Sequence, residues 1–192
     1  MSNPRAVRLF YDYIDPASFL LDRRLRQWAD PNETPLALVP FEISVPPAPL
    51  LDPNEAGAVA YWEKLKEAAR PLGFELKRPW IVPWSRKAHE LAMEARQENC
   101  FREIHNALFR AYLLEGLDIG RIDVLVDLSR QQGMDPVKTK AVLDVDKHRA
   151  AILSEREAAL RAGISRSPTV LRPGGRLEGY PDEETLREFV SP

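Results

Sequence analysis

The pattern of apolar and polar residues changes period twice near the start of the chain. The apolar run at residues 7–11 has the β-branched and aromatic side chains of a strand. After Asp15-Pro16 the apolar residues recur at helical spacing as far as Trp28, with charged residues on the opposite face. A second apolar run, residues 36–41, follows a predicted turn at 30–33. This order predicts a βαβ unit with parallel strands and a right-handed crossover.

The middle of the chain is predicted to be helical. Residues 43–53 are too rich in proline for a helix or a central strand, so we expect an ordered linker there. Residues 74–84 show no period and are expected to form a loop. Caps, helical spacing and terminal glycines predict helices from Asp52-Pro53 to about 69, from a Ser85 cap to about 95, from 101 to Gly116, from 124 to Gly133, from Asp135-Pro136 onward, and from about 146 to Gly163.

The end of the chain returns to strand patterns. Residues 164–171 are followed by a turn at 173–175, a short strand from Arg176 and a last helix at 182–190, which predicts a hairpin with a covering helix. The predicted fold class is therefore α/β, a thioredoxin fold (βαβ and ββα) carrying an all-helical insertion. We expect residues 1–50 and 163–192 to form the thioredoxin-like domain and residues 51–162 the insertion.

Composition narrows the function classes. The chain has 192 residues, 44% hydrophobic and 29% charged, with a net charge of -2, so it lacks the basic field of a nucleic-acid-binding protein. No apolar run is long enough to span a membrane and the first residues have no signal-peptide core, so we expect a cytoplasmic protein. The single cysteine, Cys100, excludes an intramolecular disulfide and a cysteine-based metal cluster. We interpret Cys100 as a buried structural thiol, and we expect no metal site.

The N-terminus of the first helix is the main candidate site. An Asp at the N-cap accepts hydrogen bonds from main-chain N–H groups, and a Pro at the first helical position loses no needed donor. The same N–H groups and dipole would attract a bound anion. A cap is favoured over a catalytic carboxylate at Asp15, because Asp-Pro recurs at 52–53 and 135–136 without implied chemistry. Ser18, in the first turn, is expected to bond to the main chain.

Aromatic residues and a histidine in the insertion are weaker candidates. His89 falls among apolar helix positions, so a satisfied, partly buried histidine is favoured over a proton carrier. Trp80 and Trp84 either belong to the insertion core or line a ligand cleft.

Four landmarks of the chain together resemble the DsbA-like thioredoxin-fold proteins, especially the branch with FrnE-like oxidoreductases and 2-hydroxychromene-2-carboxylate isomerases. The resemblance covers nearly the whole chain. Its landmarks are Phe10-Tyr11-Asp12-Tyr13-Ile14-Asp15-Pro16, Ser85-Arg86-Lys87-Ala88-His89-Glu90-Leu91-Ala92, Leu108-Phe109-Arg110-Ala111-Tyr112 followed by Glu115-Gly116-Leu117-Asp118-Ile119-Gly120, and Gly163 through Ser167-Pro168-Thr169. The resemblance implies a cis bond before Pro168, which would face the active-site loop.

The sequence departs from this family where the chemistry should be. The loop carries Cys-x-x-Cys in the oxidoreductases and a catalytic Ser at the first position in the isomerases, whereas here the two positions hold Asp15 and Ser18. Neither a carboxylate nor a hydroxyl can form a mixed disulfide. We therefore expect no thiol-disulfide exchange.

Three functions remain open from the sequence. The first is a redox-inactive protein that binds a small molecule or peptide in a cleft near Asp15, Ser167 and Trp84. The second is a glutathione-dependent isomerase or transferase, in which the main chain of Ser167 would hold glutathione, the one candidate cofactor. A carboxylate at position 15 opposes the thiolate that this chemistry requires, and only Asp182 is placed to hold a γ-glutamyl group. The third makes Asp15 a nucleophile or base. A homodimer stays open.

Overall fold

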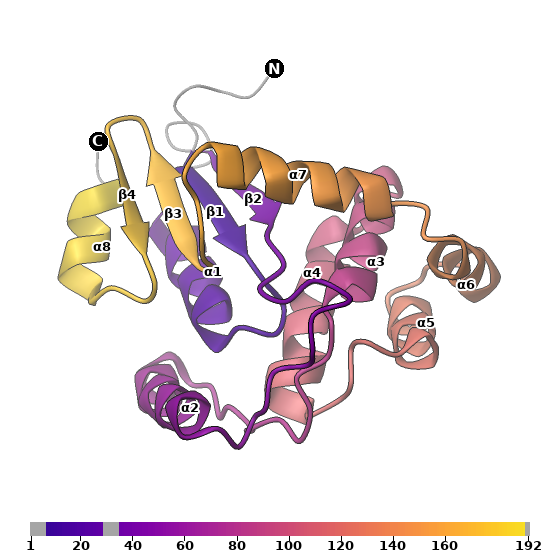
Figure 1. Cartoon of the computed structure of the whole chain (residues 1–192), viewed down its shortest axis with the longest axis horizontal. Helices are drawn as coiled ribbons and strands as arrows, with labels where there is room; N and C mark the ends of the chain where they lie inside the picture. Colours follow the sequence, from indigo (N-terminus) through magenta and orange to yellow (C-terminus); the bar gives the residue numbers. More distant parts are fainter. Residues whose placement is uncertain (1–6, 29–34, 191–192) are drawn as a thin grey trace. The chain divides into compact units, whose positions relative to one another are not determined.

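The computed structural model describes residues 7–28 and 35–190, so the turn predicted at 30–33 lies outside the described residues. Within them, strands and helices follow the predicted order (Figure 1). The elements are β1 (Val7–Tyr11), α1 (Pro16–Trp28), β2 (Leu36–Pro40), α2 (Ala56–Ala69), η1 (Arg70–Leu72), α3 (Arg86–Gln97), α4 (Phe101–Arg110), η2 (Ala111–Glu115), α5 (Ile122–Gln131), α6 (Pro136–Asp144), α7 (Arg149–Arg161), β3 (Thr169–Arg172), β4 (Gly175–Glu178) and α8 (Glu183–Val190).

The four strands form one sheet in the order β2-β1-β3-β4. β1 and β2 are parallel, with Leu9 opposite Leu38. β3 runs antiparallel to β1 and pairs with β4 as a hairpin, with Leu9 opposite Val170. This topology confirms the predicted thioredoxin fold, with βαβ and ββα halves that meet in the centre of the sheet.

Two compact units make up the chain. One comprises residues 1–43 and 155–192, and the other residues 44–154, so that the boundary falls within α7. The first contains the sheet, α1 and α8, and the second contains the helices from α2 to α6. The domain division expected from the sequence, 1–50 with 163–192 against 51–162, stays a prediction.

Successive side chains of β1 point to opposite faces of the sheet. Phe10 packs with Phe41, Ala159 of α7 and Ile164 in a buried cluster that also includes Val39 and Leu171. Leu9 is fully buried on the opposite side of the strand, and α1 contacts both β1 and α8. Both faces of the sheet are therefore covered. This packing fixes the position of the C-terminal end of β1, from which the site loop begins.

The helix starts correct two predictions made from the sequence. α2 begins at Ala56 because the Glu55 carboxylate accepts hydrogen bonds from Gly57 N and Ala58 N, whereas Asp52 bonds Asn54 N in a turn before it. α7 begins at Arg149 rather than at Asp146, whose φ of 54° is left-handed and breaks the helical path.

Two further helix boundaries follow the predicted local chemistry, and a third lacks its predicted cap. Asp135 caps α6 by accepting from Val137 N and Lys138 N. Gly116 ends η2 with a φ of 76°, a left-handed conformation that glycine adopts without strain. Ser85 stands at the N-cap of α3, but its side chain makes no capping hydrogen bond.

Candidate functional site at the N-terminus of α1

Asp15 caps α1 as predicted. One carboxylate oxygen, Oδ1, accepts from Ala17 N at 3.2 Å, and the other, Oδ2, accepts from Ser18 N at 3.0 Å. The Asp15 side chain also accepts a short hydrogen bond of 2.6 Å from the hydroxyl of Ser18 to Oδ2. Three donors therefore converge on one carboxylate, which neutralises the positive end of the helix.

Ser18 links the cap to the loop before β3. Its Oγ accepts from Asp12 N at 3.2 Å and lies 2.9 Å from Oγ of Ser167. Because a hydroxyl has one proton and that of Ser18 goes to Asp15, the Ser167 hydroxyl donates to Ser18. The result is a directed chain from Ser167 through Ser18 to Asp15, which leaves the Ser18 oxygen engaged on every side.

The bond between Ser167 and Pro168 is cis, as the resemblance implied. Pro168 O accepts from Gly179 N at 2.8 Å, and Thr169 Oγ1 donates to Arg166 O at 2.8 Å, so the segment is held on both sides of the proline. Asp15 and Ser18 are buried, whereas Ser167 is half-buried. A ligand that reaches this site would meet Ser167 first.

Asp12 is a further part of the site that the sequence did not identify. It is fully buried, and its Oδ2 accepts from Ile43 N at 2.7 Å while its main-chain O accepts from Asp15 N at 3.2 Å. Asp12 thereby ties the loop after β1 to the segment after β2. An acid placed directly after a buried strand, within the landmark at residues 10–16, was the available signal.

Cys100 takes no part in this site. It stands at the N-cap of α4 in the unit of residues 44–154 and is partly exposed, so the interpretation as a buried thiol was wrong. Partial burial, together with the charges of Glu98 and Glu103, raises the pKa of the Cys100 thiol. A thiol with a raised pKa is a poor nucleophile at neutral pH.

The other predicted site residues lie in the helical unit. Trp84 is 37% exposed, and its Nε1 donates to Ala48 O at 3.1 Å. His89 is 1% exposed, so it is fully rather than partly buried. Trp80 is 68% exposed, which excludes it from the insertion core. The structure assembles Asp15, Ser18, Ser167 and Pro168 within one unit, and a shared site with Trp84 and His89 stays a prediction.

Asp182 serves as a helix cap. Its Oδ1 accepts from Thr185 N and its Oδ2 from Thr185 Oγ1, both at 2.8 Å. The hydrogen bonds from Thr185 lower the pKa of Asp182. Across residues 7–28 and 35–190, no three side chains of His, Cys, Asp or Glu are grouped as a metal ion requires, and no helix is long and apolar enough to cross a membrane.

The sheet, the cis proline and the helix N-terminus facing it define the class of DsbA-like thioredoxin-fold proteins, here without the redox cysteines. The chain belongs to the DSBA-like thioredoxin domain family, which matches residues 6–191.

Three proteins to which the chain is similar share 15–25% of their residues with it. The uncharacterized protein YwbO of Bacillus subtilis is 25% identical over 96% of this chain and 95% of its own length. Among solved structures, a probable DsbA oxidoreductase from Streptomyces coelicolor superposes with a TM-score of 0.81 at 15% identity, covering 97% of this chain and 88% of that one. A 2-hydroxychromene-2-carboxylate isomerase superposes with a TM-score of 0.78 at 18% sequence identity, covering 96% of this chain and 93% of that one. At these identities the structures show a shared fold.

Proposed function

We propose that this protein binds a peptide or a peptide-like small molecule beside the N-terminus of α1, and that it performs no thiol-disulfide exchange. The observation that carries the proposal is the hydrogen-bonded chain Ser167-Ser18-Asp15, which stands where the oxidoreductases of the family hold two cysteines. In this chain the two positions supply structure in place of redox chemistry.

The main chain of Ser167 supports binding. Among residues 7–28 and 35–190, neither its N–H nor its C=O makes a hydrogen bond, while its neighbour Pro168 is held by Gly179. A main-chain donor and acceptor on a half-buried residue can pair with an extended peptide in the manner of an added strand. The charge of Asp15 favours a ligand that is neutral or cationic at its contact with the helix end.

An insulin reduction assay tests the loss of redox activity. Wild-type protein should show the same background rate as Cys100→Ser, because the single thiol has a raised pKa and no resolving partner. The double variant Asp15→Cys/Ser18→Cys is the positive control, since a helix N-terminus lowers a thiol pKa and favours a reactive Cys-x-x-Cys. Turnover by the wild type that disappears in Cys100→Ser would refute the proposal.

Glutathione is the second candidate ligand. A cytosolic disulfide reductase, DsbM from Pseudomonas aeruginosa, has been solved with GSH and shares the fold, with a TM-score of 0.64, 16% identity, and coverage of 90% of this chain and 89% of that one. Glutathione is itself peptide-like, and the open main chain of Ser167 suits it. The carboxylate of Asp15 opposes a thiolate at the helix end, which ranks this function second.

Calorimetric titration of reduced glutathione into wild type and Asp15→Asn separates the two candidates. Asn keeps the size and the capping geometry of Asp but removes its charge, so Asp15→Asn should bind glutathione more tightly than the wild type. Tight binding to the wild type would place the isomerase or transferase function first. We place the protein in the cytoplasm as part of this proposal, a point that cell fractionation tests.

A further inference from the structure

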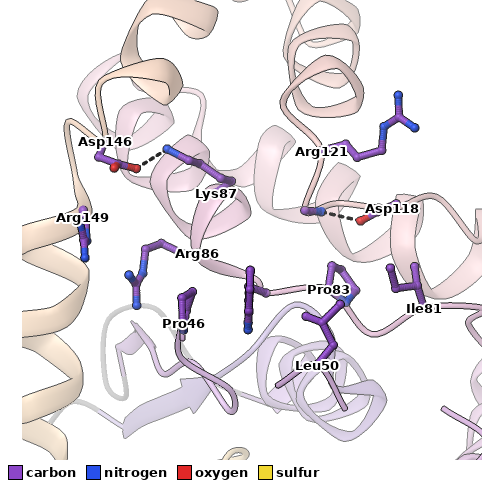
Figure 2. Close-up of a pocket in the computed structure, with 12 residues that line it drawn as sticks. Pro46, Leu50, Ile81, Pro83, Arg86, Lys87, Asp118, Arg121, Asp146 and Arg149 are labelled. Atoms are coloured by element: carbon purple, nitrogen blue, oxygen red, sulfur yellow. Dashed lines mark hydrogen bonds and ion pairs between the residues drawn. The ribbon is translucent and has the colours of Figure 1, made fainter. Parts of the chain in front are cut away.

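A pocket of about 440 Å³ lies within the helical unit of residues 44–154 (Figure 2). Its residues come from the proline-rich segment, the loop before α3, the first turn of α3, the loop before α5, and the segment before α7 together with the start of α7. None of the residues of the α1 site lines it. A volume of a few hundred Å³ with mixed apolar and charged walls is typical of small-molecule sites.

The apolar wall of the pocket is preformed. It consists of Pro46, Leu50, Ile81, Pro83 and Trp84. The hydrogen bond from Trp84 Nε1 to Ala48 O fixes the indole. Gly120 closes the wall, because a Cβ at that position would lie 2.7 Å from Cβ of Pro83. The two loops therefore meet at a distance that no larger residue allows, and the wall can form before a ligand arrives.

The acids of the pocket are paired, whereas Arg149 interacts with them only through its charge. Asp146 pairs with Lys87, and Asp118 Oδ1 accepts from Gly120 N at 2.9 Å. Arg121 pairs with Asp123 at 2.6 Å, and Figure 2 shows its guanidinium directed away from the other labelled side chains. Across the described residues the guanidinium of Arg149 makes no side-chain hydrogen bond or salt bridge, but its charge, like that of Arg86, acts on the Asp146 carboxylate and helps to lower the pKa of Asp146.

A second positive feature comes from the start of α3. Arg86, the first residue of this helix, lines the pocket and is 7% exposed. The N-cap residue Ser85 makes no side-chain hydrogen bond to the first turn and that turn contains no acidic residue, so α3 itself supplies neither a cap nor a negative charge at the positive end of its dipole. An anionic group beside Arg86 and Arg149 would therefore meet two guanidinium groups and a helix end, and it would share the two guanidinium groups with Asp146, which also pairs with Lys87.

We propose that this pocket binds an amphipathic organic anion. The apolar body of the ligand packs on Trp84 and the prolines, and a carboxylate or phosphate pairs with Arg86 and Arg149. The proposal does not rest on the function proposed for the α1 site, which is argued from Asp15, Ser18 and Ser167, none of which lines this pocket.

Nuclear magnetic resonance titration of the ¹⁵N-labelled full chain tests the site with benzoate, phenyl phosphate and the neutral analogue benzyl alcohol. The indole N–H signal of Trp84, assigned with Trp84→Phe, reports on the pocket. Both anions should shift this signal, with affinity about fivefold or more above that of benzyl alcohol, equivalent to roughly 1 kcal/mol. Whichever of the two anions binds more tightly shows whether the site prefers a carboxylate or a phosphate.

Arg149→Gln is the decisive variant, because Arg149 is exposed and its loss should not impair folding. Arg149→Gln should lower the affinity for both anions about fivefold and leave the affinity for benzyl alcohol unchanged. Arg161→Gln, at the other end of the same helix, is the matched control and should bind as the wild type does. The proposal would be overturned if benzyl alcohol bound as tightly as the anions or if Arg149→Gln had no effect on anion affinity. It would also be overturned if the Trp84 signal did not move. Asp15→Asn should leave the anion affinity unchanged, which separates this site from the first.

Discussion

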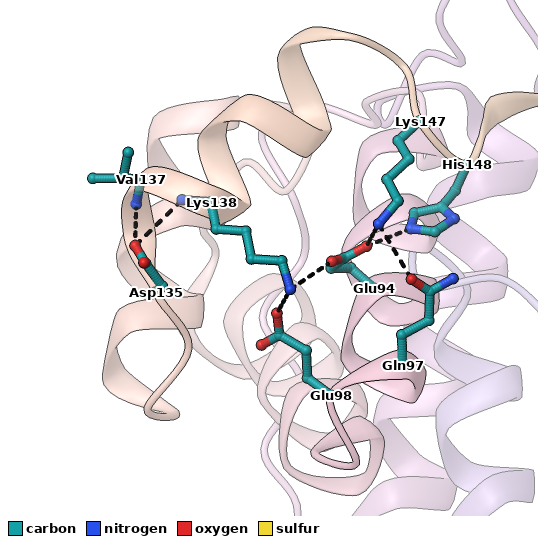
Figure 3. A network of polar contacts seen from close by, with 8 residues as sticks. All are labelled: Glu94, Gln97, Glu98, Asp135, Val137, Lys138, Lys147 and His148. Atoms are coloured by element: carbon teal, nitrogen blue, oxygen red, sulfur yellow. Dashed lines mark hydrogen bonds and ion pairs between the residues drawn. The ribbon is translucent and has the colours of Figure 1, made fainter.

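Glu94 of α3 is expected to be the most important charged residue for the stability of the helical unit. Its side chain is 1% exposed. Its Oε2 lies 2.7 Å from His148 Nε2 and 2.6 Å from Lys147 Nζ, and its Oε1 lies 3.3 Å from Lys138 Nζ (Figure 3). One carboxylate therefore joins α3 to α6 and to the segment before α7.

The pKa of Glu94 sets the expected magnitude. Burial raises this pKa, but hydrogen bonds from Lys147, His148 and Lys138 outweigh it and lower the pKa from 4.5 to about 2. A difference of this size corresponds to about 3 kcal/mol at neutral pH. Because Lys147 and Lys138 are 38% and 53% exposed and regain hydration when the carboxylate is lost, we expect Glu94→Gln to cost about 2 kcal/mol. In a protein of this size that lowers the denaturation temperature by roughly 4–8 °C.

The stabilisation by the Glu94 carboxylate should be lost as the pH falls. The pKa of Glu94 is lower in the folded than in the unfolded chain, so its stabilisation is complete above about pH 4.5 and is lost as the pH falls towards about 2. Urea unfolding followed by circular dichroism should show the full difference between wild type and Glu94→Gln at about pH 7. The difference should shrink at about pH 3 as the wild-type carboxylate is protonated in the unfolded chain.

Glu98→Gln is the matched control. Glu98 follows α3, its side chain is 23% exposed and it pairs with Lys138, so its removal should cost less than about 1 kcal/mol. The reasoning fails if Glu94→Gln is as stable as Glu98→Gln at neutral pH. It also fails if the loss caused by Glu94→Gln is the same at both pH values.

Two further stability predictions follow from the packing. Asp15→Asn and Asp15→Ser should keep most of the stability, whereas Asp15→Ala should cost about 1–2 kcal/mol in thermal unfolding, because it removes the cap and a partner of the buried Ser18 hydroxyl. Equal stability of all three variants would contradict the capping role. Gly120→Ala should cost about 1–3 kcal/mol because the new Cβ overlaps Pro83, whereas the control Gly57→Ala meets only the flexible end of Glu55 and should stay within about 1 kcal/mol of the wild type.

The order of elements was determined by the sequence because its signals are short-range. The Asp15 and Asp135 caps each act on N–H groups two or three residues away, and glycine at 116 ends its helix through its own φ. Such interactions depend on neighbours that the sequence shows directly. The local signals gave the wrong start for α2, because two acids, Asp52 and Glu55, are both placed to cap it and the structure uses Glu55.

The sites were decided by tertiary structure. Ser18 and Ser167 are 149 positions apart, and no pattern along the chain predicts that their hydroxyl groups lie 2.9 Å from each other. The same holds for Glu94 and His148, which are 54 positions apart, and for the pocket between the proline-rich segment and α7. Sequence shows which residues can donate, accept or carry charge, but only the packing of the sheet and of the helices determines which of them meet, because those distances depend on the whole fold.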